Sequence, residues 1–228
     1  MATRSSGTPR PAGPPPDQAA LREAALAHLA RFATTERGLT QVLERRIGRW
    51  ARRAAEDGVS SDEIAGVTAR LMPLCAVVAG KMAELGAVDD SSFARARAAR
   101  LTRSGQSRRS VEARLAAKGV ATSTVAEVLD ETLGEDERAR DSELAAALVF
   151  ARKRRVGPFG GGTSGSDVSD DGAAGLADEA ERQAAQKQDA RILAAFARAG
   201  FTRDVAMRAL AMDRDEAGER IIAMKDAL

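Results

Sequence analysis

The chain is poor in the residues from which sheets, disulfide frameworks and metal sites are built. Among its 228 residues there is no tyrosine, one tryptophan (Trp50), one cysteine (Cys75) and one histidine (His28). Alternating runs of β-branched or aromatic residues are also missing, so strand content is expected to be near zero. A single cysteine excludes a disulfide framework, and a histidine without a second ligand at metal-binding spacing argues against metal sites and histidine-dependent catalysis. We predict no metal, no cofactor and no enzymatic activity.

Proline is nearly absent after the first 16 residues, where five of the seven prolines lie. Residues 1–17 are therefore expected to be a disordered proline-rich tail. No apolar signal segment opens the chain, and no run of 18 apolar residues free of charge follows. We expect a cytoplasmic protein that does not enter a membrane.

Alanine, leucine, arginine and glutamate dominate the remainder, and all four are good helix formers. Three glycines end helical stretches in the same context, because each is followed by an apolar residue and then by a serine or threonine within three positions. These glycines and hydroxyl residues are Gly58 with Ser60, Gly119 with Thr122, and Gly200 with Thr202. Glycine can close a helix in the left-handed conformation, and the hydroxyl can cap the next helix. The pattern predicts three tight helix-turn-helix corners, and Ser60 with Glu63 also fits a capping box.

One further helix precedes each corner pair, at about 18–33, 91–103 and 136–155, and Asp90 is expected to cap the second of these. The predicted fold is all-α, with three tandem three-helix, helix-turn-helix-like repeats that form an elongated, curved molecule. Repeat 1, with extended helices, covers 18–88, repeat 2 covers 89–134, and repeat 3 covers 135–212. A flexible Gly-rich insertion at 157–176 interrupts repeat 3, and a helical tail covers 213–228. The insertion lacks the lysine and the preceding strand of a phosphate-binding loop.

The net charge of +2 identifies no partner, but the charges are segregated along the chain. One stretch of repeat 2 contains many basic residues and a single acidic residue, Glu112. Its basic residues are Arg95, Arg97, Arg100, Arg103, Arg108, Arg109, Arg114 and Lys118. An acidic stretch follows at 127–143. Two secondary basic clusters are Arg45, Arg46, Arg49, Arg52 and Arg53, and then Arg152, Lys153, Arg154 and Arg155. Single exposed arginines usually only solvate a helix, but so many without nearby acids indicate a face that binds phosphates or acidic protein surface.

Segment 86–94, GAVDDSSFA, resembles the opening of the middle repeat in the RecX family of recombinase regulators. Segments 107–109 (SRR) and 115–120 (LAAKGV) continue this similarity. Segments 29–32, 42–46 and 195–202 resemble the motifs of the outer repeats, so the resemblance runs from about 18 to 212. The chain departs from the family pattern in the extended region 48–82, in the Gly-rich insertion, and at Ala199, where a basic residue is common.

The resemblance implies a protein that lies in the groove of a RecA filament on single-stranded DNA and limits its growth or activity. From the residues we expect any contact with that DNA to be with its phosphates and without sequence readout, because the aromatic side chains needed for base stacking are few. We also expect a monomer. Two other functions remain open from the residues alone. A helix-turn-helix transcription factor would need a basic recognition helix, whereas the helix after the second corner carries Glu127, Asp130 and Glu131. A scaffold that binds only protein would bind without strong salt dependence.

Overall fold

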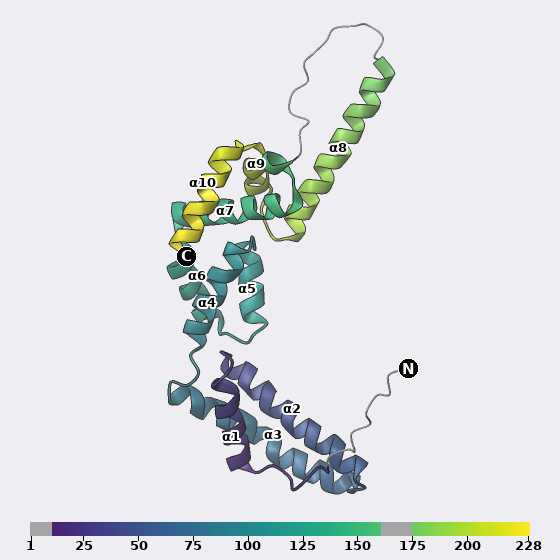
Figure 1. The fold of residues 1–228 in the computed structure, drawn as a ribbon, viewed down its shortest axis with the longest axis vertical. Coiled ribbons are helices and arrows are strands. Elements are labelled where there is room, and N and C mark those ends of the chain that lie inside the picture. The colour runs from purple at the N-terminus through teal and green to yellow at the C-terminus, as the bar shows by residue number, and fades with distance from the viewer. Residues whose placement is uncertain (1–10, 161–174) are drawn as a thin grey trace, which may run out of the picture. The chain divides into compact units, whose positions relative to one another are not determined.

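The computed structural model describes residues 11–160 and 175–228, the last range without side chains before 182, and every regular element in that part is helical. The all-α prediction is confirmed (Figure 1). The elements are α1 (Gln18–Leu29), α2 (Glu36–Glu56), α3 (Ser61–Glu84), α4 (Asp90–Arg103), α5 (Arg108–Ala116), α6 (Thr122–Leu133), α7 (Asp136–Arg154), the short 3-10 helix η1 (Gly157–Phe159), α8 (Gly175–Arg198), α9 (Arg203–Ala211) and α10 (Arg214–Ala227). Most of the predicted insertion, 161–174, lies outside the described residues.

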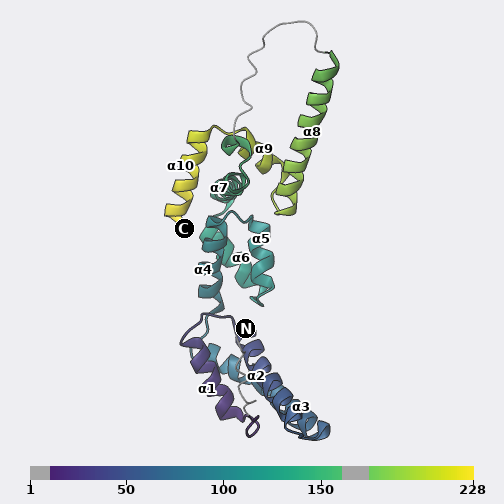
Figure 2. The same cartoon turned by 45° about the vertical axis from the view of Figure 1, so that its right-hand side comes forward.

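The chain divides into two compact units. The first comprises residues 1–93 and 118–120, and the second comprises 94–117 and 121–228. In the first unit α1, α2 and α3 lie side by side (Figures 1 and 2). Apolar residues one turn apart on α2, such as Leu39, Leu43 and Ile47, are fully buried against α3, where Val67, Leu71 and Cys75 face them. Burial, with a smaller effect of the Glu44 charge, raises the pKa of the Cys75 thiol to about 11, so the thiol stays protonated near neutral pH.

Helix α3 is long and apolar enough to cross a membrane by length and composition. In this structure one face of the helix packs into the core of the first unit, against α1 and α2. Its outward face carries small or apolar residues such as Ala69, Met72 and Val77. With α2, this helix makes repeat 1 longer than the others, since α2 and α3 span 21 and 24 residues and α5 and α6 span 9 and 12. Two long helices thus lie in the region where the sequence predicted extended helices.

The second unit is built around α7. The buried face of α7 includes Ala145, Ala146 and Ala147, whose small side chains let neighbouring helices approach closely, and α9 packs directly on it. Phe196 and Phe201 are buried in the same core, where the Phe150 ring meets that of Phe196 edge-on at 4.8 Å.

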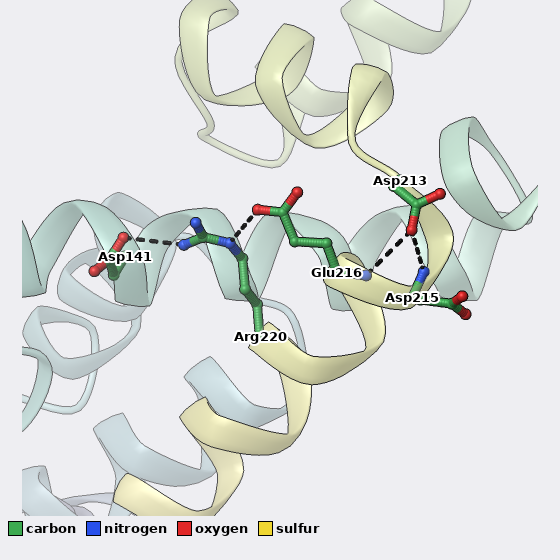
Figure 3. Close-up of polar contacts among 5 residues, drawn as sticks. All are labelled: Asp141, Asp213, Asp215, Glu216 and Arg220. Carbon is green, nitrogen blue, oxygen red and sulfur yellow. Dashed lines mark hydrogen bonds and ion pairs between the residues drawn. The ribbon is translucent and has the colours of Figure 1, made fainter.

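Helix α10, the predicted C-terminal tail, docks on α7 through buried Ala217, Ile221 and Met224. Asp213 caps its first turn by accepting hydrogen bonds from the backbone N–H groups of Asp215 and Glu216 (Figure 3), and these bonds hold the pKa of its carboxyl below the usual value. Arg220 then joins two elements, because its guanidinium donates to Glu216 at 3.0 Å and to Asp141 of α7 at 3.3 Å. Caps and packing together make this segment a structured part of the second unit.

The three corner glycines have left-handed φ angles of +85° at Gly58, +84° at Gly119 and +92° at Gly200. The predicted caps on α3 and α9 are confirmed, since the hydroxyl oxygen of Ser60 accepts from Glu63 N–H and that of Thr202 from Val205 N–H. Two cap predictions are wrong. Ala121 occupies the position before α6, so Thr122 lies inside that helix and caps nothing.

The second wrong cap is Asp90, because α4 is capped by its neighbour. The Asp89 carboxylate accepts from Ser92 N–H, while the Asp90 carboxylate accepts from the Glu36 N–H at the start of α2. The Asp90 side chain therefore accepts a hydrogen bond at the start of α2 and does not cap α4. Adjacent acids made the two indistinguishable by sequence alone.

The corners at Gly119 and Gly200 are held by the same kind of contact. In each, a buried hydroxyl caps the start of one helix and also donates a hydrogen bond to the carbonyl just before the corner glycine. In the first unit Thr35 Oγ1 accepts from Gly38 N–H at the start of α2 and donates to the carbonyl of Lys118, just before Gly119, at 2.7 Å. In the second unit Ser107 Oγ accepts from Ser110 N–H at the start of α5 and donates to the carbonyl of Ala199, just before Gly200, at 2.7 Å. We call these the hydroxyl-corner contacts. Their equivalence is compatible with tandem repeats.

Candidate partner-binding face

The basic residues of repeat 2 separate into two groups according to whether they have partners inside the protein. Arg95 donates through Nε and Nη2 to one carboxylate oxygen of Glu131, at 3.3 and 3.1 Å. Arg108 binds the Asp130 carboxylate and also reaches the carbonyls of Leu129 and Gly134. Both of these acids lie on α6. The acidic helix thus pairs with part of the basic stretch that precedes it.

Arg108 is further fixed at the N-terminus of α5. Its backbone N–H donates to Oε2 of Glu143 on α7 at 2.8 Å, beside the cap formed by Ser107. Burial raises the pKa of the Glu143 carboxyl above its ordinary value, while the hydrogen bond and the charge of Arg108 act in the opposite direction. This arrangement gives Arg108 a structural task, which is to join α5, α6 and α7.

A second group of arginines faces other arginines. Arg97 and Arg100 lie one turn apart on α4, and Arg114 approaches them from α5. Burial first, then repulsion from Arg100 and Arg114, lowers the pKa of the Arg97 guanidinium. Nε of Arg97 is buried and has no hydrogen-bond partner within the described residues. We call these three residues the arginine triad.

The triad lacks internal counter-charges. No ion pair among the described residues involves its members, and Arg114 Nε donates a long hydrogen bond of 3.4 Å to the Ser110 hydroxyl. Glu112, the one acid of this stretch, lies two positions from Arg114 and so points to a different side of α5. Like charges held together without acids repel each other, and an anion that binds them relieves that repulsion. The triad is therefore suited to receiving a carboxylate or a phosphate.

The second unit carries further basic residues outside the triad. Arg103 and Arg109 are exposed and form no ion pair among the described residues. Lys153, from the third cluster, donates to the carbonyl of Ser104 in the turn just after Arg103, at 2.8 Å. Gly105 permits this approach, since a Cβ there would lie 2.9 Å from the Phe150 nitrogen. Repeat 2 and the cluster at the end of α7 therefore meet at one turn.

The remaining members of the clusters lie elsewhere. Arg154 stacks over the Phe150 ring at 4.7 Å, and Arg155 ends α7 in the left-handed conformation. Arg152 is exposed on the last turn of α7. Lys118 belongs to the first unit, as does the α2 cluster of Arg45, Arg46, Arg49, Arg52 and Arg53, whose members are all exposed. The structural roles of Asp130, Glu131 and Glu143 as partners of Arg95 and Arg108 were not predicted from the sequence. The sequence feature that could have indicated them is the acidic stretch that directly follows the basic one.

Two known proteins are similar in sequence to this chain. The chain is 30% identical over 190 residues to the "Regulatory protein RecX" of Myxococcus xanthus, which covers 83% of this chain and 83% of that protein. It is 32% identical over 131 residues to the "Regulatory protein RecX" of Agrobacterium fabrum, which covers 58% of this chain and 55% of that protein. No family model matches the chain, and no solved structure matches it.

Proposed function

The chain belongs to the RecX family of regulatory proteins, and on this basis we propose that it regulates RecA by binding the RecA filament on single-stranded DNA and limiting its activity. The observation that carries the proposal is the arginine triad, a cationic centre without internal acids on the helices that resemble the family's middle repeat. A regulator of this kind needs shape and charge and no catalytic group. The protein acts as a monomer in this proposal.

The triad supplies the contact with the filament. Arg97, Arg100 and Arg114 meet acidic RecA side chains or DNA phosphates, both of which form charge-assisted hydrogen bonds with guanidinium groups. Each such bond contributes about 1.5–3 kcal/mol. Because phosphate contacts carry no sequence information, binding is independent of DNA sequence.

The test reverses charge in the triad and measures inhibition of the DNA-dependent ATPase of RecA. Arg100→Glu combined with Arg114→Glu removes two exposed members and leaves the partly buried Arg97 in place. Loss of two bonds at about 1.5 kcal/mol each raises the concentration needed for half-inhibition roughly a hundredfold. Arg108 is unsuitable for this test, because its replacement would break contacts with α6 and α7.

Arg208→Glu is the matched control, since Arg208 is an exposed arginine on α9 with no ion pair among the described residues. It makes the same Arg→Glu replacement once, with half the total charge change of the double triad variant, and should leave inhibition unchanged. Circular dichroism verifies that helicity is retained. Full inhibition by the folded triad variant would exclude the triad as the contact, and no effect of the unaltered protein on RecA would exclude the function.

A further inference from the structure

A cleft of about 450 Å³ lies in the first unit, between α2 and the segment that leads into α1. One wall is the face of α2 that carries Arg46, Arg49 and Arg53, with Trp50 between them. The opposite wall is the run Pro14-Pro15-Pro16. This volume lies in the range of sites that hold small molecules, about 300–1,000 Å³.

Two hydrogen bonds hold the proline wall against the unit. Ala12 N–H donates to the Asp57 carboxylate at 2.7 Å, and the indole Nε1 of Trp50 donates to the carbonyl of Gly13 at 3.3 Å. Ala12 also packs against the apolar core of the unit. Residues 11–17, which the composition predicted as part of a disordered tail, are thus attached to the folded domain, whereas residues 1–10 lie outside the described part. The proline rings restrict the backbone, so the wall is stiff.

The cleft is strongly cationic. Positions 46, 49 and 53 follow the helical repeat and share one face of α2, with rises of roughly 4.5 and 6 Å between them. None of the three arginines takes part in an ion pair among the described residues. The one acid in the lining is Asp17, whose carboxylate already accepts from Ala20 N–H at 2.7 Å as the cap of α1. Among the lining residues three positive charges therefore face one negative charge, and the Asp57 carboxylate lies just outside the lining, on the N–H of Ala12.

We propose that this cleft binds a phosphate ester. Arginine forks match the oxygen geometry of phosphate, and three of them on one face can surround a single phosphoryl group or follow two neighbouring ones. The proline rings and the edge of Trp50 give the cleft an apolar side on which a sugar or base can lie. The ligand is a nucleotide-like phosphate ester, either free or as part of a single strand. This site belongs to the first unit, so it does not depend on the arginine triad or on RecA.

The fluorescence of Trp50 can be used to measure binding in the cleft. Trp50 lines the cleft, and the chain has no other tryptophan and no tyrosine, so fluorescence excited near 295 nm comes from the cleft alone. The unaltered protein is titrated with inorganic phosphate, thymidine 5′-monophosphate and a short oligothymidylate, without RecA. Saturable changes in emission are expected with the phosphate esters. If thymidine 5′-monophosphate saturates the change in emission, a free phosphate ester is sufficient for binding. If only the oligothymidylate changes the emission, the ligand is a phosphodiester strand.

Arg49→Gln with Arg53→Gln should weaken binding roughly a hundredfold, because two charge-assisted bonds are lost. Arg70→Gln is the matched control, since Arg70 is exposed on α3 of the same unit and does not line the cleft, and it should bind as the unaltered protein does. Asp57→Ala keeps every arginine but frees Ala12 N–H, so it should weaken binding and shift the emission of Trp50 to longer wavelength.

Three outcomes would overturn the proposal. The first is no response to any phosphate compound by the unaltered protein, measured again by calorimetry so that a silent tryptophan is not mistaken for absence of binding. The second is an affinity loss in the Arg70→Gln control as large as that in the Arg49→Gln, Arg53→Gln variant, which would indicate non-specific attraction by the positive charge of the protein. The third is saturable binding of an acidic peptide such as oligoglutamate with no binding of phosphate esters, which would assign the cleft to protein carboxylates.

Discussion

Replacing Gly200 with alanine should destabilise the protein far more than replacing Gly58, although the two glycines have nearly the same backbone conformation. Their φ angles are +92° and +85°, so alanine meets a similar backbone strain at both positions. That strain costs about 1–2 kcal/mol, and the stiffer unfolded chain offsets about 0.4–1 kcal/mol of it. A Cβ at Gly58 meets no atom within 4 Å. Gly58→Ala should therefore lose about 1 kcal/mol of stability.

At Gly200 the added Cβ would lie 2.5 Å from the hydroxyl oxygen of Ser107, which is fully buried. Ser107 must move, and the hydroxyl-corner contact is lost. The cap on Ser110 N–H contributes about 1 kcal/mol, and the hydrogen bond to the Ala199 carbonyl contributes about as much. Together with the backbone strain, Gly200→Ala should lose about 3 kcal/mol.

Urea denaturation followed by circular dichroism measures both losses. A second pair of variants isolates the contact, because in a Ser107→Gly background the hydroxyl is already missing and Gly200→Ala should then cost only about 1 kcal/mol. Equal losses for Gly58→Ala and Gly200→Ala, or strictly additive losses for Ser107→Gly and Gly200→Ala, would refute the reasoning.

Two further predictions concern charge. Because the pKa of Glu143 is raised in the folded protein, the native state binds its proton more readily than the unfolded chain does, and the contribution of this group to stability falls as pH rises through the raised value. Glu143→Gln should thus gain stability relative to the unaltered protein as pH is raised from about 4 to about 7 in urea titrations, and a difference independent of pH would contradict the shift. If the arginine triad meets three phosphates of single-stranded DNA, a slope of about −0.7 per phosphate predicts roughly twentyfold weaker filament binding between 50 and 200 mM salt. Binding that does not change with salt would favour a scaffold that contacts only protein.

Much of the local structure followed from the sequence because its signals act over a few residues. Corner glycines, the Ser60 and Thr202 caps and the apolar spacing predicted helices whose bounds agree closely with the structure at α4 and α7. Where two candidates were adjacent, as with Asp89 and Asp90, local rules could not choose between them. The choice depended on Glu36, 54 residues away.

Sequence by itself determined that the chain is helical and that arginines gather before an acidic stretch. Only the tertiary structure decided which arginines are neutralised. Arg95 and Arg108 pair with α6, whereas Arg97, Arg100 and Arg114 face one another without an acid. The reason is physical: a charge pattern records sign and order along the chain, but an ion pair requires two groups within about 4 Å, a distance fixed by how helices pack.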